Sequence, residues 1–182
     1  GKIGIIGAGL MASQLAVLFL RRYGVPVVMK DIKQEFLDKG IGYVRGELAS
    51  LVSKGKLTQA KADHLNHILI GTLEWNDFAD CDFVIEAVFE EMAIKQEVFA
   101  QAEEVVSSLC ILATNTSSLS ITEMASNLKY PERVVGFHFF NPVAVLPLVE
   151  IIKGEKTDDA TLATAFDIAK KIKKNAILVK DS

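Results

Sequence analysis

The feature that most constrains the fold is a glycine-rich turn near the start of the chain, between a short apolar segment and an apolar helix. Residues 7–12 read Gly-Ala-Gly-Leu-Met-Ala, which fits G-x-G-x-x-A, and they directly follow the apolar residues 2–6. The first glycine permits a tight turn, the second lets the backbone approach a pyrophosphate, and the small third residue lets helix and strand pack closely. The helix start offers free N–H groups and a positive dipole end to phosphates. The turn therefore predicts a dinucleotide-binding unit, with a ligand-free glycine turn as the alternative.

A second apolar segment, residues 25–30, ends at Asp31. An acid at this position accepts hydrogen bonds from the ribose hydroxyls of adenosine, and its charge repels a 2′-phosphate. Lys30 and Lys33 flank it and reduce that repulsion. We therefore predict NAD rather than NADP as the cofactor. An ordinary polar residue at a strand end is the alternative for Asp31.

The rest of the chain alternates apolar segments with amphipathic ones. Strands are expected at 68–70, 83–88, 111–114, 134–140, 148–152 and 176–180, and helices at 10–22, 34–52, 58–66, 92–107 and 158–174, with a short helix opened by a capping box at 120–123. This alternation is typical of a mostly parallel sheet with helices on both faces. With 182 residues, half of them hydrophobic, the chain can build one sizeable core. We predict a single α/β domain with a Rossmann-type, doubly wound sheet.

Composition argues against several functional classes. The net charge of −3 without a basic block argues against a nucleic-acid partner. No apolar run approaches the ~20 residues that span a bilayer. Cys81 and Cys110 are isolated and His64 and His67 lack a third ligand nearby, so we predict no metal site. No signal peptide is visible, and both ends suggest a piece of a longer protein.

Three side chains with acid–base or hydrogen-bonding chemistry lie in or beside successive apolar segments: Ser117, His138 and Glu150. A carboxylate that is buried without a partner costs free energy or takes up a proton. Pairing with an imidazole avoids this cost, fixes the tautomer and stabilises the imidazolium formed in turnover. Glu86, within its own apolar segment, is a rival partner. A core histidine bonded to a backbone carbonyl is the alternative reading of His138.

Ser117 follows the end of a strand, where open α/β sheets bind ligands, and its hydroxyl is a candidate to hold the reacting oxygen. Loop capping is the alternative. Asn115 and Asn141 are candidates for hydrogen bonds to a nicotinamide carboxamide, although Asn141 before Pro142 also fits a simple turn. Lys95 alone is more typical of a solvated helix charge than of a phosphate contact. The turn and the His/carboxylate pair together predict hydride transfer with an acid–base histidine.

Five motifs resemble a known family. They are residues 7–12, Val-Ile-Glu-Ala-Val-Phe-Glu at 84–90, Ala-Thr-Asn-Thr-Ser-Ser-Leu at 113–119, Gly-Phe-His-Phe-Phe-Asn-Pro at 136–142 and Leu-Val-Glu at 148–150. Over residues 1–182 the chain resembles the NAD-binding domain of L-3-hydroxyacyl-CoA dehydrogenases, especially those within multifunctional β-oxidation chains. Ala12 departs from the third glycine of the family's turn.

The resemblance implies NAD-dependent oxidation of (S)-3-hydroxyacyl-CoA to 3-ketoacyl-CoA in fatty-acid β-oxidation. It implies His138 as the general base, Glu150 as its partner, Ser117 as a catalytic substrate contact and Lys54 as a coenzyme A contact. The cofactor site it implies consists of Gly7, Gly9, Leu10, Met11, Ala12, Asp31, Ala87, Val88, Glu90, Lys95, Asn115 and Asn141.

The resemblance also implies that a helical C-terminal domain is absent from this chain. That domain supplies the dimer contact and part of the acyl pocket, so we expect the chain to be inactive alone and the longer protein to be oligomeric. The expected location is the cytoplasm, or the mitochondrial matrix in a eukaryote. The rival functions are another β-hydroxyacid dehydrogenase with a lysine base, against which the His/Glu pair argues, and a non-catalytic NAD-binding or structural module.

Overall fold

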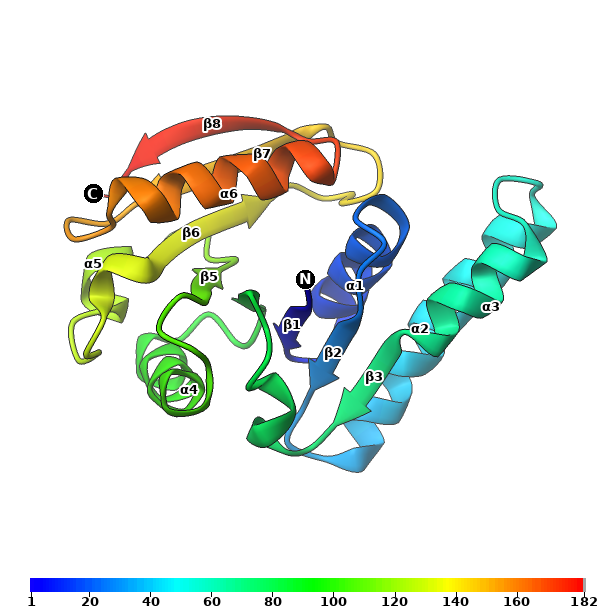
Figure 1. Ribbon diagram of the computed structural model, residues 1–182, viewed down its shortest axis with the longest axis horizontal. Helices are drawn as coiled ribbons and strands as arrows, with labels where there is room; N and C mark the ends of the chain where they lie inside the picture. Colours follow the sequence, from blue (N-terminus) through cyan, green and yellow to red (C-terminus); the bar gives the residue numbers. More distant parts are fainter. Residues whose placement is uncertain (182) are drawn as a thin grey trace.

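The chain forms an eight-stranded sheet in the computed structural model, which describes residues 1–181 (Figure 1). Its strands are β1 (Ile3–Ile6), β2 (Val27–Lys30), β3 (Leu69–Thr72), β4 (Phe83–Glu86), β5 (Ile111–Thr114), β6 (Val134–Phe139), β7 (Leu148–Lys153) and β8 (Asn175–Lys180). The order across the sheet is β3-β2-β1-β4-β5-β6-β7-β8. The first six strands are parallel, β7 is antiparallel to β6, and β8 is parallel to β7.

Helices cover both faces of the sheet, and each face has its own hydrophobic core. One core joins the strands to α1 (Leu10–Arg22), α2 (Gln34–Ser53), α3 (Gln59–His67) and α6 (Asp159–Lys171). The other joins them to α4 (Met92–Val105), α5 (Ile121–Met124) and the 3₁₀ turn η1 (Trp75–Phe78); a second 3₁₀ turn, η2, spans Pro131–Arg133. The predicted doubly wound, mostly parallel α/β fold is therefore confirmed.

The two cores arise because successive strand residues point to opposite faces. On β1, Ile5 packs in the α1 core and Ile6 in the α4 core. A row of aromatic rings extends the first core, with Phe83 centred 6.1 Å from Phe19 on α1 and 5.4 Å from Phe137 on β6. Strands that are buried on both faces have continuous apolar sequences. This explains why apolar strand segments stand out from the amphipathic helix segments in the sequence.

The predicted helix starts at Thr58 and Ser120 are confirmed by side-chain caps. Thr58 Oγ1 accepts a hydrogen bond from Lys61 N (3.1 Å), and Ser120 Oγ accepts one from Glu123 N (3.1 Å). The last helix is shorter than predicted and ends at Lys171, because Lys173 adopts a left-handed backbone conformation with φ 61°. Within residues 1–181, no helix combines the length and apolar character needed to cross a membrane.

Candidate active site

The glycine turn lies at the carboxyl edge of the sheet, between β1 and β4. The chain leaves β1 toward β2 on one side and returns to β4 on the other, which makes this the switch point where open α/β sheets bind ligands. Gly7 N donates to Lys30 O (2.7 Å) and Ala87 N donates to Ile6 O (3.0 Å). These bonds hold the turn between the ends of β2 and β4.

The turn fits the pyrophosphate of a dinucleotide. Gly7 has φ 115°, and a Cβ there would lie 3.1 Å from Ala87 O, so a side chain is disfavoured. At Gly9 a Cβ would meet nothing within 4 Å, which leaves the backbone open to a ligand. No side chain caps the first turn of α1, so its N–H groups stay available for phosphate oxygens. Ala12 is fully buried, as its packing role requires.

Asp31 lies at the end of β2 and binds the backbone of the turn. Its Oδ2 accepts from Ala8 N (2.9 Å) and its Oδ1 from Ile32 N (2.7 Å), and each oxygen keeps a lone pair for a further donor. Gly40 on α2 supports this arrangement, because a Cβ there would lie 2.6 Å from Ala8 O. Sequence reasoning missed Gly40, although a glycine within a helix is a signal of close packing.

Exposed apolar side chains follow four of the strands at this edge. Leu10 follows β1 and is 63% exposed, Ile32 follows β2 and is 76% exposed, and Phe89 follows β4 and is 82% exposed. Val145, after β6, is also largely exposed. Apolar groups at one end of a sheet indicate a surface that a ligand or another part of the protein covers. Ile32 and Phe89 were missed, and their only sequence signal is an apolar residue directly after a strand.

His138 and Glu150 form a hydrogen-bonded pair. They face each other directly in the antiparallel register of β6 and β7, which places their side chains on the same face. Nδ1 of His138 lies 3.0 Å from Oε1 of Glu150, and the side chains remain 17% and 28% exposed. Within residues 1–181, Nε2 has no hydrogen-bond partner. The imidazole is thus oriented through one nitrogen and presents the other.

Ser117 and the two asparagines lie in the loops after β5 and β6. Oδ1 of Asn115 accepts from Phe139 N (3.0 Å) and so joins the end of β5 to β6. The Asn115 amide nitrogen remains available as a donor. Exposed Ser117 donates to Oε2 of Glu90 from its backbone N (3.1 Å) and from Oγ (3.3 Å). Asn141 is exposed in the turn that begins the β6–β7 connection.

Glu86 is occupied by Lys95 and is not the partner of His138. Lys95 Nζ lies 2.6 Å from Oε1 and 2.8 Å from Oε2 of Glu86, and both side chains are almost completely buried. The interpretation of Lys95 as a solvated helix charge is therefore wrong. A lysine on an amphipathic helix usually faces water, but this one lies on the face of α4 that packs against the sheet, opposite a buried acid.

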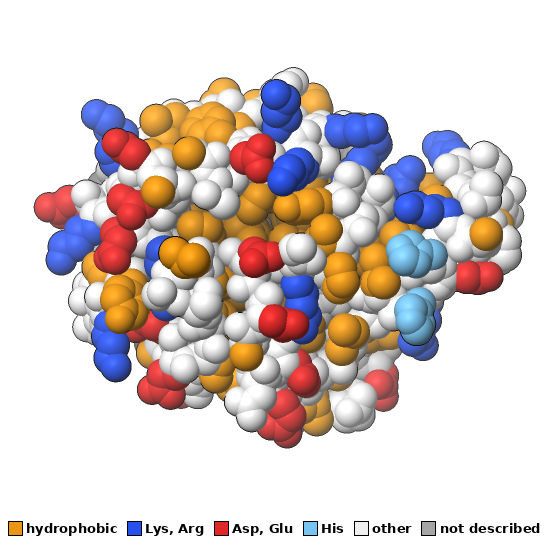
Figure 2. All heavy atoms as spheres, viewed as in Figure 1, with side chains coloured by type: hydrophobic (Ala, Val, Ile, Leu, Met, Phe, Trp, Pro, Cys, Tyr) orange, Lys and Arg blue, Asp and Glu red, His pale blue; other side chains and the backbone are white. Residues whose placement is uncertain are grey.

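The other candidate residues lie elsewhere. Lys54 is exposed at the carboxyl end of α2. The α2–α3 pair lies at the right of Figure 1. His64 and His67 are exposed on α3, as predicted, and pale blue side chains gather there in Figure 2. Burial raises the pKa of Cys81 and of Cys110 to about 12, so both remain protonated thiols. Among residues 1–181, no three His, Cys, Asp or Glu side chains are grouped as metal ligands.

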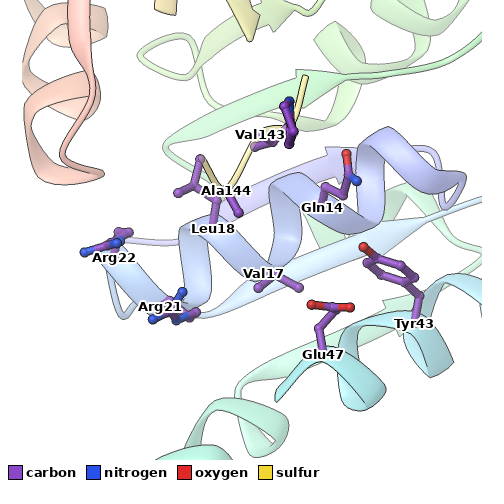
Figure 3. A pocket seen from close by; sticks show the side chains of 10 residues that line it. Gln14, Val17, Leu18, Arg21, Arg22, Tyr43, Glu47, Val143 and Ala144 are labelled. Atoms are coloured by element: carbon purple, nitrogen blue, oxygen red, sulfur yellow. The ribbon is translucent and has the colours of Figure 1, made fainter. Parts of the chain in front are cut away.

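A pocket lies beside α1, away from the glycine turn (Figure 3). Side chains of α1 and α2 and the loop after β6 line it, and the lining includes Arg21, Tyr43, Glu47 and Val143. It contains none of the residues predicted to bind cofactor or substrate.

Comparison with known proteins identifies the family. Residues 2–182 match the family model described as "3-hydroxyacyl-CoA dehydrogenase, NAD binding domain". The chain belongs to this family. Members of the family bind NAD through this domain, so the predicted cofactor and the resemblance are both confirmed.

Named relatives agree with this assignment. The chain is 40% identical over 179 residues to a peroxisomal fatty acid β-oxidation multifunctional protein, MFP2, of Arabidopsis thaliana, covering 98% of the chain and 24% of the relative. It is 44% identical over 180 residues to the fatty acid oxidation complex subunit alpha of Psychrobacter arcticus, covering 99% and 25%. The structure of (S)-3-hydroxybutyryl-CoA dehydrogenase PaaH1 from Ralstonia eutropha matches with TM-score 0.94 and 38% identity, covering 100% of the chain and 64% of PaaH1. The chain thus spans about a quarter of the multifunctional relatives.

Proposed function

We propose that this chain is the nucleotide-binding domain of an enzyme that oxidises (S)-3-hydroxyacyl-CoA to 3-ketoacyl-CoA in fatty-acid β-oxidation. His138 is the general base and Glu150 holds it. The observation that carries the proposal is the 3.0 Å contact between Nδ1 and Glu150, which leaves Nε2 free at the carboxyl edge of the sheet. The family assignment and the relatives named for 3-hydroxybutyryl-CoA dehydrogenation and fatty-acid oxidation support the substrate class.

The chemistry is divided between the domain and its cofactor. NAD, when bound, accepts the hydride that leaves C3 of the substrate. His138 Nε2 takes the proton of the C3 hydroxyl, and Glu150 stabilises the imidazolium that results. As the proton and hydride leave, the C3–O bond becomes a carbonyl. Ser117 holds the reacting oxygen beside the imidazole.

The chain's own residues would bind the cofactor as follows. The backbone of the turn from Gly7 to Ala12 receives the pyrophosphate, and Asp31 accepts the adenosine ribose hydroxyls. Ala87, Val88 and Glu90, in the segment after β4, line the cofactor site. Asn115 and Asn141 border the nicotinamide. Lys54, at the far end of α2, would contact coenzyme A. A lysine base is disfavoured, because the buried Lys95 directs its donors at two carboxylates.

The domain alone holds half of the catalytic geometry. Catalysis requires C3 to be held within ~3–3.5 Å of the nicotinamide, and we propose that a helical domain of the longer protein closes the acyl pocket and forms the dimer contact. Residues 1–182 should therefore bind NADH but form negligible NADH from 3-hydroxybutyryl-CoA, whereas the longer protein should turn it over. Turnover by the short chain within about tenfold of the long one would show that one domain builds the whole site. No turnover by either would contradict the proposed function.

A further inference from the structure

A buried ion pair joins the end of β4 to α4. Glu86 ends β4 and Lys95 lies on α4, with side-chain exposures of 0% and 1%. Two further donors reach Glu86: Thr114 at the end of β5 donates to Oε1 through its hydroxyl, and Val88 N donates to Oε2 (3.1 Å). Buried ions persist only when their lone pairs and protons are well paired, and here Glu86 accepts from three groups. Neither the proton transfer nor the hydride transfer of the proposed reaction uses this pair, and Lys95 is assigned only to the lining of the cofactor site.

The pair continues to the surface through Glu90. Lys95 Nζ lies 3.4 Å from Oε1 of Glu90, a side chain that is 40% exposed. The other oxygen of Glu90 accepts from the backbone N and the hydroxyl of Ser117. Burial alone would raise the pKa of Glu90, but hydrogen bonds from Ser117 and Thr116, together with the Lys95 ammonium, lower it below its usual value. Glu90 is thus an ionised acceptor fixed between a buried cation and the Ser117 loop.

We propose that Thr114, Glu86 and Lys95 are positioning residues for Ser117, acting through Glu90. This inference rests on the proposed function, because it assumes that Ser117 holds the reacting oxygen. Glu86 and Thr114 hold the ammonium, the ammonium holds one oxygen of Glu90, and the other oxygen fixes the Ser117 backbone. The backbone contact persists when the Ser117 hydroxyl turns from Glu90 toward a substrate oxygen. The ends of β4 and β5 and the start of α4 thereby set the position of one hydroxyl.

A double-mutant cycle in the longer protein tests this inference. The variant Glu86→Gln/Lys95→Met removes both buried charges together, so neither is left unpaired. It should lower kcat/KM for 3-hydroxybutyryl-CoA by about tenfold at saturating NAD, a typical coupling within one hydrogen-bond network. In a Ser117→Ala background the same double change should cost less than about twofold, because the residue it positions is gone. Losses that multiply fully, or a double variant as active as wild type, would overturn the inference.

Two further sets of variants separate positioning from folding. Thr114→Val removes one donor to Glu86 at nearly constant volume and should reduce kcat/KM, whereas Thr114→Ser keeps the hydroxyl and should restore it. If the double variant does not fold, the two Thr114 variants provide the test. Equal kcat/KM values for Thr114→Val and Thr114→Ser would overturn the inference. The exposed pair Asp167–Lys171 on α6, 3.1 Å apart, provides the control: Asp167→Asn/Lys171→Met should leave the kinetics unchanged.

Backbone hydrogen exchange distinguishes this inference from the proposed function. The Ser117 amide should lose protection in Glu86→Gln/Lys95→Met, whether or not the protein turns over an acyl-CoA. If the double variant loses this protection although the wild-type protein forms no NADH from 3-hydroxybutyryl-CoA, the proposed function is contradicted and the contact network stands. Unchanged protection beside normal wild-type turnover would overturn the network and leave the function standing.

Discussion

Two pairs, each of a carboxylate and a nitrogen-containing side chain, lie at the same edge of the sheet and differ in their access to water. His138 and Glu150 meet across β6 and β7 with side chains 17% and 28% exposed, and one imidazole nitrogen is free. Glu86 and Lys95 meet between β4 and α4 and are almost wholly buried. The first pair is open enough for the proton transfer that we propose. The second contacts a partly exposed side chain at Glu90. We call His138–Glu150 the open pair and Glu86–Lys95 the sealed pair.

This difference in exposure suits the first pair to catalysis and the second to a structural role. An imidazole held by one nitrogen and open at the other is the arrangement needed for general base catalysis. A sealed ion pair pays a desolvation cost of several kcal/mol per ion, on the order of its mutual attraction, so its net contribution to stability is small. Removing one member is costly, because the other is left as an uncompensated buried charge. The two pairs should therefore fail in different ways when they are broken.

The largest expected effect is on the sealed pair. Lys95→Met leaves Glu86 buried without its cation and should lower the free energy of unfolding of residues 1–182 by about 3–5 kcal/mol in urea. The double variant Glu86→Gln/Lys95→Met should recover most of that loss. Asp167→Asn, which breaks an exposed pair, should change stability by no more than about 0.5 kcal/mol. Equal losses of unfolding free energy in Lys95→Met and Asp167→Asn would mean that the Glu86–Lys95 pair contributes no more than an exposed pair.

Breaking the open pair should lower turnover and should hardly change the free energy of unfolding. In the longer protein, His138→Ala should reduce turnover of 3-hydroxybutyryl-CoA by ~10² or more, as expected for loss of a general base. NADH affinity, measured by nicotinamide fluorescence, should hardly change. The exposed His64 is the matched control, and His64→Ala should keep full activity.

A matching change tests the choice of carboxylate. Glu150→Gln should also slow turnover, because the amide no longer stabilises the imidazolium. We expect the loss to be smaller than that of His138→Ala, since the base itself remains. If Glu150→Gln has no effect on turnover while Glu86→Gln abolishes it without loss of stability, the assigned partner is wrong.

The open pair was predictable from the sequence and the sealed pair was not. His138 and Glu150 each interrupt an apolar run and stand close enough in the chain to face each other across neighbouring strands. Glu86 was also recognised as a buried acid, but its cation lies on a helix, where lysine normally faces water. Thr114 belongs to the 113–119 motif, but a threonine at a strand end fits many roles, so the sequence does not link it to Glu86.

The predictability of the fold also depends on whether a feature is set by neighbouring or by distant residues. The start of α1 and the caps at Thr58 and Ser120 depend on neighbouring residues, and these predictions are confirmed. The reversal of β7 depends on pairing between distant segments, which periodicity does not encode. The same holds for Lys174, whose buried Nζ donates to Val143 O (2.6 Å) and holds the β6–β7 loop. The roles assigned to Ser117, Asp31 and the other site residues remain predictions.

A third carboxylate, Asp31, extends the comparison to an acid held by backbone donors alone. We propose that its charge faces the ribose 2′-hydroxyl of the cofactor, so NADH should bind more tightly than NADPH by roughly 1–3 kcal/mol. Asp31→Ala should narrow that gap in fluorescence titrations of residues 1–182. The exposed Asp38 on α2 is the control, and Asp38→Ala should preserve the gap. Equal affinities in the wild-type chain would remove Asp31 from its assigned role.

The smallest expected effect concerns Glu90, the point where the sealed network reaches water. Its pKa is lowered in the folded chain, because hydrogen bonds from Ser117 and Thr116 and the Lys95 charge outweigh the opposing effect of burial. A depressed carboxyl pKa stabilises the fold fully above the unfolded value, about 4.3 for glutamate, and that stability is lost as pH falls through the lower folded value. The contribution is modest because Glu90 is 40% exposed. Urea unfolding of residues 1–182 at pH values on both sides of that window should show a shallower acid-side loss for Glu90→Gln than for wild type. Identical pH dependences would mean that the Ser117 contacts do not favour the ionised acid, and that the network stops at Lys95.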